Sequence, residues 1–187
     1  ASYFYGPDVV FPAQQDLDTA RGGTRDLLVA WEIGKFRYSE WPAGLHDAYL
    51  DQVAAAARTF PYAMYVRPWP EMNGDWTSFQ PTPTGEKEHG GTPEEFIAAW
   101  RYVVTYLRER GATNLRWVFN PTTDTYVGTT DIRTIYPGDE YVDILGLDGY
   151  NWGNTGLGWG PWRTFEDIYR EQYDRLAALH PTAPVWI

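Results

Sequence analysis

Residues 63–76 read Ala-Met-Tyr-Val-Arg-Pro-Trp-Pro-Glu-Met-Asn-Gly-Asp-Trp. They begin with a short, nearly continuous apolar run, Ala63–Arg67, which is typical of a strand buried on both faces of a parallel sheet. The residues after this run bring a carboxylate, an amide and two indoles together within a few positions. The segment therefore predicts a buried strand that ends in a cluster of polar and aromatic side chains.

Strand-like and helix-like patterns alternate on both sides of this segment. Other short apolar runs, each bounded by polar residues, glycine or proline, are Leu27–Trp31, Leu115–Phe119, Val142–Leu147 and Pro184–Ile187. Longer stretches with apolar residues at helical spacing are Leu45–Arg58, Phe96–Arg110 and Phe165–Leu179. The second of these helices has a capping box in Thr92-Pro93-Glu94-Glu95 and a stop at Gly111. This alternation predicts a parallel α/β fold, either a barrel or an open sheet.

The ends of several predicted strands favour the barrel. Polar and aromatic residues follow these strands at Glu32, Arg67–Asn73, Asn120–Asp124 and Asp148–Trp152. No glycine fingerprint for a nucleotide follows any strand in the sequence. A site assembled from the ends of several strands is typical of the (β/α)8 TIM barrel. We therefore expect residues 1–187 to form a single, partial barrel domain.

Composition narrows the classes of ligand. The 187 residues carry a formal net charge of −10 without a basic stripe, so nucleic acid would be repelled. The absence of cysteine excludes disulfides and thiolate metal sites. Ten Trp and fourteen Tyr are more than a core of this size needs, and their rings suit the flat C–H faces of sugars. The alternative is that about half of the tryptophans are structural.

No membrane span, metal site or cofactor is expected. No apolar run approaches the roughly 20 residues of a spanning helix, and the first residues lack the basic start and apolar stretch of a signal peptide. His46, His89 and His180 lie far apart, without metal-ligand spacing, and are expected to be solvated. An acidic stretch is expected to be a solvated loop where weak calcium binding stays open, and it comprises Asp124, Asp131, Asp139 and Glu140.

Glu71 is the candidate catalytic residue of the segment. Cleavage of a glycosidic bond needs a carboxylic acid whose pKa is high enough to keep its proton near neutral pH. The tryptophan and proline neighbours of Glu71 would raise its pKa by desolvation, whereas Arg67 would lower it if the two were adjacent. A structural Arg67–Glu71 ion pair is the alternative interpretation.

Residues 65–76 resemble the acid/base motif of glycoside hydrolase family 26, Arg-Pro-x-His-Glu-Met-Asn-Gly-x-Trp. The positions that match are Arg67, Pro68, Glu71, Met72, Asn73, Gly74 and Trp76. Val142–Trp152 resembles the sixth-strand motif of the family, and Asn114–Pro121 resembles its fifth strand. The three motifs stand in the family's order along the chain.

The resemblance implies a (β/α)8 barrel that hydrolyses β-linked polysaccharides with retention, mostly β-1,4-mannans, with some β-glucans and β-1,3-xylans. Glu71 would be the acid/base, and Tyr150 would correspond to the tyrosine that hydrogen-bonds the nucleophile. Arg67 and Asn73 would brace Glu71. The remaining predicted contacts to substrate are Glu32, to a sugar hydroxyl, and the aromatic platforms Trp76, Trp117 and Trp152.

Two departures from the family pattern matter. The family's histidine before the acid/base is Pro70 here, which has no side-chain donor, so a β-glucan or another β-linked polymer competes with mannan. The nucleophilic glutamate of the family ends its seventh strand, which Pro184–Ile187 resembles. With Tyr3–Tyr5 at the second strand, the chain would represent strands two to seven, and the nucleophile would lie just beyond Ile187.

The sequence thus predicts a secreted, monomeric endo-β-glycanase acting on β-1,4-mannan, without a cofactor and without nucleic-acid or membrane partners. The alternatives are a β-glucanase or β-1,3-xylanase of the same family, or a non-catalytic glycan-binding protein. Glu32 and Asp148, at strand ends, are the weaker candidates for the nucleophile. The segment Gln80–Gly91, rich in Pro, Gly and Thr, is expected to be a surface loop flanking the cleft, or else a plain connector.

Overall fold

A computed structural model describes residues 2–125, 128–154 and 160–187 of the protein. Its strands form one parallel sheet in the order β1-β2-β3-β4-β5-β6, so each strand pairs with the next one along the chain. This order never reverses, as it does in a doubly wound open sheet, and it is the order of a barrel wall. The strands are β1 Ser2–Tyr5, β2 Leu27–Trp31, β3 Met64–Pro68, β4 Leu115–Phe119, β5 Ile144–Gly146 and β6 Val185–Trp186.

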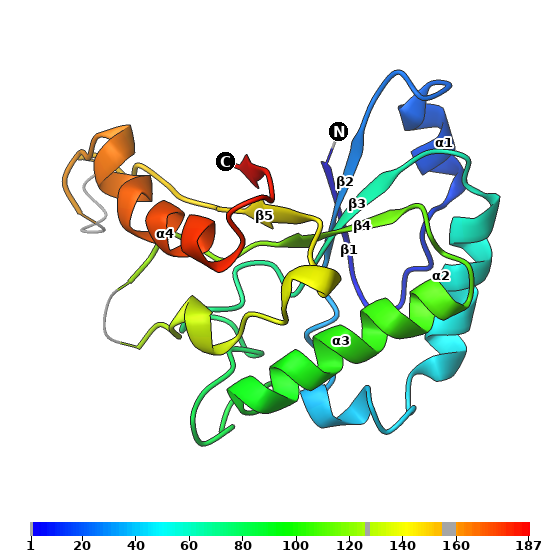
Figure 1. The fold of residues 1–187 in the computed structure, drawn as a ribbon, viewed down its shortest axis with the longest axis horizontal. Coiled ribbons are helices and arrows are strands. Elements are labelled where there is room, and N and C mark those ends of the chain that lie inside the picture. Colours follow the sequence, from blue (N-terminus) through cyan, green and yellow to red (C-terminus); the bar gives the residue numbers. More distant parts are fainter. Residues whose placement is uncertain (1, 126–127, 155–159) are drawn as a thin grey trace.

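The helices surround this sheet on its outer side, and Figure 1 shows that they leave uncovered the side on which the two chain ends lie. The helices are α1 Gln14–Ala20, α2 Asp47–Thr59, α3 Pro93–Glu109 and α4 Phe165–Leu179. Short 3-10 turns lie at Tyr38–Glu40, Ile132–Thr134 and Asp139–Tyr141. Among the helices that the structure describes, none has the length and apolar character to cross a membrane. The predicted barrel architecture is confirmed, with six of its strands represented.

The boundaries of α3 follow from its capping residues. The hydroxyl of Thr92 accepts the backbone N–H of Glu95 at 3.3 Å, and the Glu95 carboxylate accepts the N–H of Thr92 at 2.8 Å. Gly111, after the helix, has a φ of 82°, which costs glycine nothing. The predicted capping box and stop are therefore confirmed.

The structure also contains a helix that the sequence analysis does not predict. The seven residues of α1 show no regular spacing of apolar residues. The helix is held instead mainly by one buried carboxylate. Asp16 accepts the backbone N–H of Ala13 at 2.6 Å and the hydroxyl of Tyr5 at 2.8 Å. This polar anchor ties α1 to β1, and hydrophobic periodicity cannot detect it.

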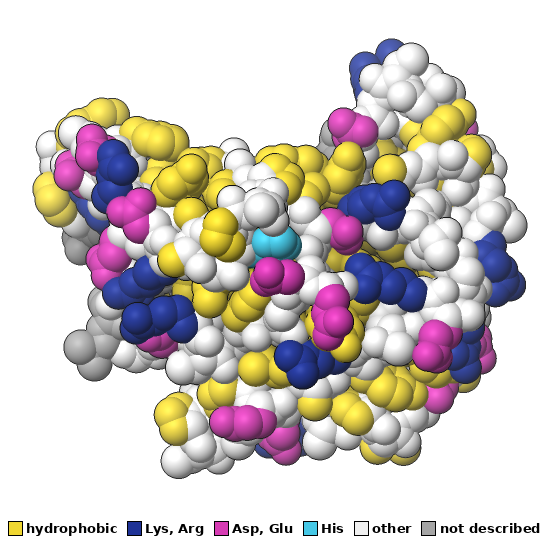
Figure 2. All heavy atoms as spheres, in the orientation of Figure 1, with side chains coloured by type: hydrophobic (Ala, Val, Ile, Leu, Met, Phe, Trp, Pro, Cys, Tyr) yellow, Lys and Arg dark blue, Asp and Glu magenta, His cyan; other side chains and the backbone are white. Residues whose placement is uncertain are grey.

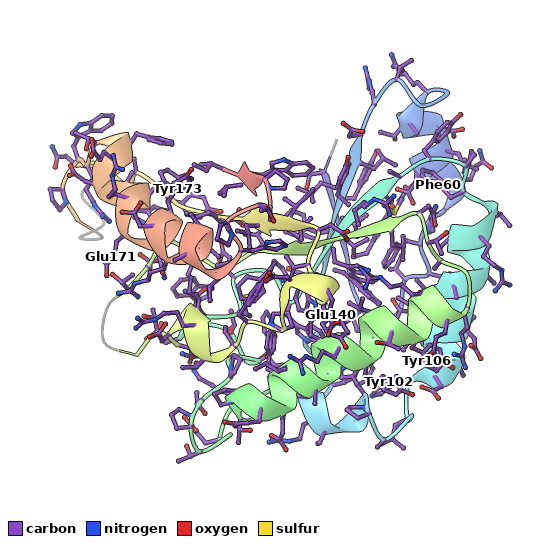
Figure 3. All side chains as sticks on the ribbon, viewed as in Figure 1. Phe60, Tyr102, Tyr106, Glu140, Glu171 and Tyr173 are labelled. Carbon is purple, nitrogen blue, oxygen red and sulfur yellow. The ribbon has the colours of Figure 1, made fainter. Side chains whose placement is uncertain are left out.

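Helices α2 and α3 lie side by side against the sheet, and Figure 3 labels Tyr102 and Tyr106 on the side of α3 that faces α2. The Tyr102 hydroxyl donates to the Asp47 carboxylate at 2.6 Å, and the Tyr106 hydroxyl donates to that of Asp51 at 3.1 Å. These bonds join the two helices behind β3 and β4. The strand that leads to Glu71 therefore rests on a fixed layer.

Side chains alternate between the two faces of the sheet. On the outer face, Phe119 of β4 packs edge-on against Trp100 of α3, with 5.7 Å between ring centroids. On the inner face, Trp186 of β6 lies 4.7 Å from the ring of Tyr65 on β3. Figure 2 shows the molecule hollowed between the end that carries α4 and the end that carries α1, with hydrophobic side chains along this hollow. The carboxyl ends of the strands meet at one rim of the sheet, and the candidate site lies there.

Candidate active site

A groove formed by three adjoining hollows crosses the carboxyl ends of the strands. The central hollow has a volume of about 350 Å³ and contains Glu71 with Glu32, Arg67 and Asp148. A larger hollow of about 730 Å³ adjoins it and shares Glu71, Trp76 and Tyr150 with it. A third hollow of about 440 Å³ adjoins the central one on the other side and shares Glu32 and Phe79. Glu71 therefore stands inside a continuous groove that extends away from it in both directions.

The backbone around Glu71 is held in an unusual conformation. Both Trp69 and Glu71 have positive φ, 49° and 55°, and Pro70 lies between them. The N–H of Glu71 donates to the carbonyl of Asn120 at 2.9 Å, and the N–H of Trp69 donates to that of Trp31 at 3.1 Å. Non-glycine residues adopt this region only where the surrounding structure enforces it. The position of Glu71 is thus set by contacts to the ends of both neighbouring strands.

Trp69 anchors this turn in the core. Its indole is fully buried and makes edge-on or tilted contacts with four aromatic rings at centroid distances of 5.6–6.2 Å. These rings belong to Tyr38, Trp41, Phe96 and Trp100, and we call the five residues together the aromatic cluster. Aromatic rings prefer such edge-on geometry over face-to-face stacking. The cluster therefore fixes the residue two positions before Glu71.

The surroundings of Glu71 favour its protonated form. Burial raises the pKa of the Glu71 carboxyl above its usual value, and the charge of Asp148 raises it further. The charge of Arg67 and a hydrogen bond from the Trp76 side chain oppose this rise without cancelling it. A carboxylic acid with a raised pKa can act as a general acid near neutral pH.

Arg67 pairs with a carboxylate other than Glu71. Its guanidinium donates to the Asp148 carboxylate at 2.6 Å and to the Asn120 side-chain carbonyl at 2.7 Å. The structural Arg67–Glu71 ion pair considered from the sequence is therefore replaced by an Arg67–Asp148 pair, in which both side chains are mostly buried. Arg67 in this way joins the carboxyl ends of β3, β4 and β5.

Exposed aromatic rings wall the groove on both sides of Glu71. The ring of Trp76 lies over Gly74, where an added Cβ would approach the indole to 2.5 Å, so a larger residue there would displace the ring. Tyr150 and Trp152 stack on each other with 5.2 Å between ring centroids and an interplanar angle of 26°. The charge of Glu71 and burial both raise the pKa of the Tyr150 hydroxyl. The structure thus brings Glu71, Trp76, Tyr150 and Trp152 together, as the sequence analysis expects.

Trp117 is wrong as a predicted substrate platform, and Asn73, expected to brace Glu71 at the substrate site, is not exposed to substrate. Trp117 is fully buried on the outer face of β4, the face that Phe119 shares, because side chains two positions apart on a strand point the same way. Asn73 is also fully buried, and its amide accepts the N–H of Thr122 at 2.8 Å and donates to the Thr122 carbonyl at 3.2 Å. Asn73 therefore fixes the loop after β4 beside the loop of Glu71 and does not face the groove.

Other residues line the groove although the sequence did not predict them there. Asp124, expected in a solvated loop, lines the larger hollow with Glu71, and Thr122 beside it donates to its carboxylate at 3.3 Å. Its place after β4, in a strand end already noted as polar, is a signal that could have identified it. Phe79 and Arg163 also line the groove, but they come from long loops whose course a local pattern does not reveal.

The remaining predicted features lie outside the groove. Gln80, Thr82 and Glu86, of the segment Gln80–Gly91, line a separate hollow, and Arg37 donates to the backbone carbonyls of Gly85, Lys87 and Glu88. Within residues 2–125, 128–154 and 160–187, no group of three or more His, Cys, Asp or Glu side chains could hold a metal ion. His46 and His180 are mostly buried and are not solvated as predicted, since each lies beside a carboxylate, Glu40 and Asp139 respectively.

Comparison with known sequences gives one matching family model and several relatives. Residues 43–180 match the model of glycosyl hydrolase family 26. Endoglucanase H of Acetivibrio thermocellus is 35% identical over 154 residues, which are 82% of this chain and 17% of that protein. Mannan endo-1,4-β-mannosidase A and B of Caldalkalibacillus mannanilyticus is 39% identical over 115 residues, which are 60% of this chain and 19% of that protein. The chain thus spans less than a fifth of the length of these two relatives.

Solved structures agree on the architecture. The family 26 domain of an endo-β-mannanase/endo-β-glucanase from Prevotella bryantii superimposes with a TM-score of 0.67 and 16% identity, covering 100% of this chain and 67% of that one. The catalytic domain of an endo-β-1,4-mannanase from Bacillus sp. JAMB-750 superimposes with a TM-score of 0.55 and 28% identity, covering 72% and 39% respectively.

Proposed function

Because this chain belongs to glycosyl hydrolase family 26, we propose that it cleaves β-linked polysaccharide as a retaining endo-glycanase with Glu71 as its acid/base. The observation that carries the proposal is the place of Glu71. It is a carboxyl with a raised pKa, held at the end of β3 inside a groove that continues on both sides of it. A groove that continues on both sides of the carboxyl can hold sugar units on both sides of the cleaved bond, which suits endo-action.

The proposed reaction uses Glu71 twice. In the first step the protonated carboxyl gives its proton to the glycosidic oxygen as the bond to the leaving sugar breaks. In the second step the carboxylate takes a proton from the water that releases the bound sugar. The raised pKa supports the first role, and the exchange of one proton restores the acid for the next cycle.

Retention also requires a nucleophilic carboxylate about 5–5.5 Å from the acid/base. We propose that this residue follows Ile187, as the resemblance of Pro184–Ile187 to the family's seventh strand suggests. Asp148 suits the role poorly because Arg67 already pairs with it at 2.6 Å. Labelling with an activated 2-deoxy-2-fluoroglycoside and peptide mass spectrometry would test this, with the label expected beyond Ile187. A label on Glu32 or Asp148 would overturn it.

We propose β-1,4-mannan as the substrate, with a β-glucan as the alternative. The names of the relatives support both, since one is a mannan endo-1,4-β-mannosidase and another is an endoglucanase. Trp76, Tyr150 and Trp152 would then wall the sugar units next to the cleaved bond, and Glu32 would accept a sugar hydroxyl. We also propose that the protein works outside the cell, because polysaccharides of this kind do not cross membranes.

The direct test is the pair Glu71→Ala and Glu71→Gln. Hydrolysis of polysaccharide should fall by about 10²–10⁴-fold, the usual contribution of a general acid, whereas an aryl glycoside with a good leaving group should lose far less in its first step. The release of reducing ends measures hydrolysis of the polysaccharide, and the release of the aryl group in the first step measures cleavage of the aryl glycoside. Equal losses on both substrates, or unchanged turnover on polysaccharide, would remove Glu71 from the role.

A non-catalytic glycan-binding protein is the second candidate, and Pro70 is the observation that favours it. This buried proline has no side-chain donor, at the position where the family pattern has a histidine. Isothermal titration with β-1,4-mannohexaose, followed by an assay for new reducing ends, separates the two candidates. Binding without cleavage, in a chain that contains the nucleophile, would favour the second.

A further inference from the structure

We propose that Gln172 of α4 is a positioning residue of the reaction, which holds Asp124 at the wall of the larger hollow beside Glu71. The inference rests on the proposed function and deepens it by naming a side chain, outside the groove, that arranges the groove. Gln172 is only 1% exposed. It cannot touch substrate, so its influence on the reaction must pass through the residues that it binds.

The side chain of Gln172 is bonded to the loop after β4. Its amide nitrogen donates to the backbone carbonyl of Asp124 at 3.3 Å. Beside this bond, the hydroxyl of Thr125 donates to the Glu171 carboxylate, also at 3.3 Å. Figure 1 shows this loop running from β4 to α4. Since Asp124 lines the larger hollow with Glu71, α4 holds the backbone of a groove residue from behind.

Tyr169 gives the neighbouring loop the same support. Its hydroxyl donates to the carbonyl of Gly149, which precedes Tyr150, at 2.8 Å. Tyr169 and Gln172 stand three positions apart on α4, so they share one side of the helix. Tyr150 and Asp124 both line the larger hollow. One side of α4 therefore sets the places of two groove residues that come from different strand ends.

The contact between α4 and these loops leaves little room for movement. A Cβ added at Gly149 would come to 2.9 Å from Ile168 on α4 and to 2.7 Å from Thr123. The N–H of Thr123 donates to the carbonyl of Asp148 at 2.8 Å. Asp124 is thus attached to the end of β5 through the residue before it, and to α4 through its own carbonyl.

The unpaired half of the Gln172 amide indicates that this side chain is not kept for stability alone. Its side-chain oxygen is buried, and no residue in the described part of the chain donates to it. A buried acceptor without a donor costs stability, whereas methionine is also unbranched and has no such group. Sequences depart from local rules of this kind mainly at functional sites. What glutamine provides and methionine does not is the bond to Asp124.

The place of Asp124 matters because its charge acts on the acid/base. Burial and the charge of Asp148 raise the pKa of Glu71, and Asp124 adds to this rise, while Arg67 opposes it. The influence of a charge falls with distance, so a loosened Asp124 would let Glu71 lose its proton at a lower pH. The other titratable side chains that line the same hollows are Glu32, Tyr150 and Arg163.

The test follows the proton of Glu71 in the full enzyme. Carbon-13 NMR of the carboxyl groups, with the Glu71 signal identified by its loss in Glu71→Gln, would give its titration midpoint. The alkaline limb of the kcat/KM profile would give the midpoint in catalysis. We expect both midpoints to move toward acid pH in Gln172→Met, while the melting temperature stays equal to or above that of the parent protein. Asp124→Asn should move the midpoints at least as far, and the double variant Gln172→Met/Asp124→Asn should move them no further than Asp124→Asn does.

A matched control is Leu176→Met, which places the same residue at another buried position of α4 and should leave both midpoints in place. Unchanged midpoints in Gln172→Met, or a double variant that exceeds Asp124→Asn, would overturn the positioning role while the parent protein still hydrolyses polysaccharide. A parent protein without hydrolysis would overturn the proposed function instead, and the NMR midpoints would still decide whether Gln172 acts on Glu71. Gln172→Leu keeps the test decisive if Gln172→Met does not fold.

Discussion

The backbone N–H of Glu71 donates to the carbonyl of Asn120 at 2.9 Å, although Glu71 has a φ of 55°. This bond ties the end of β3 to the end of β4. A strained non-glycine residue costs about 1–3 kcal/mol and persists only where its surroundings determine it. The buried ring of Trp69 and the fixed φ of Pro70 supply two further constraints. The acid/base therefore stands on a backbone that its neighbours over-determine.

Substitution of Pro70 tests whether this rigidity serves catalysis. Pro70→Gly should lower kcat by about tenfold to a hundredfold with little change in KM, because small displacements of a catalytic group carry such losses. Steady-state kinetics on soluble polysaccharide measure both constants. The kcat of Pro70→Ala should lie between those of the parent protein and Pro70→Gly. A rise in KM with unchanged kcat would show instead that Pro70 acts on substrate binding.

The charge of Asp148 should set the alkaline limit of activity. Because that charge raises the pKa of Glu71, Asp148→Asn should lower it, and the proton would be lost at a lower pH. The alkaline limb of the kcat/KM profile should then move toward acid pH, since the required form is the protonated one. Glu166→Gln, on the exposed pair with Arg170, is the control and should leave the profile in place.

Glu71 should also weaken the fold at neutral pH. A carboxyl whose pKa is raised in the folded protein destabilises it fully above the raised pKa; this cost shrinks as the pH falls through that value and vanishes only below the usual pKa of a glutamate. Glu71→Gln should therefore raise the melting temperature at pH 7, because it removes the half-buried charge. At a pH well below the pKa the two proteins should melt together. A lower melting temperature at pH 7 would contradict the expected sign.

Removal of Arg67 should destabilise the protein strongly. Arg67→Ala leaves Asp148 without its partner, at side-chain exposures of 11% and 27% for the pair. We expect a loss of about 2 kcal/mol in the free energy of unfolding in urea, below the 3–5 kcal/mol of fully buried pairs because solvent reaches Asp148. Arg170→Ala breaks an exposed helical pair and should cost less than about 0.5 kcal/mol.

Substitution of Trp117 should affect the stability of the protein, whereas substitution of Trp76 should affect the binding of oligosaccharide. Trp117→Ala removes a fully buried indole and should cost about 3–5 kcal/mol of stability. Trp76→Ala removes a ring that is 50% exposed in the groove, so it should weaken oligosaccharide binding with little change in the free energy of unfolding. Urea unfolding and isothermal titration of both variants check this. The reverse result would restore Trp117 as a substrate platform.

Elements with strong local patterns were predictable. The strands Leu27–Trp31 and Leu115–Phe119 and the helix Phe165–Leu179 have the predicted bounds. The face of Trp117 could not be read from the sequence, because it follows from the pairing of Arg116 with Tyr65 of the inner face, which places Trp117 on the outer one. The helix α1 was not predictable from apolar period, since it depends on the buried carboxylate of Asp16.

The residues of the candidate site also fall into a predictable and an unpredictable group. Glu71, Trp76, Tyr150 and Trp152 belong to motifs beside strand ends, and parallel strands bring such ends to one rim. Phe79 reaches the groove only because Tyr38 and Gly34 hold its loop there. That arrangement depends on contacts between residues distant in sequence. No local pattern in the chain encodes it.

The aromatic core divides the tryptophans into two optical populations. Trp31, Trp41, Trp69, Trp100 and Trp117 are fully buried, so their emission should be blue-shifted and shielded from iodide. Trp76, Trp152, Trp162 and Trp186 are exposed, and Trp159 lies outside the described residues. Of the tryptophans that the structure describes, only Trp76 and Trp152 line the groove. A bound sugar should therefore alter a minor, red-edge part of the fluorescence, while unfolding shifts the blue part, so one spectrum reports occupancy and folding separately.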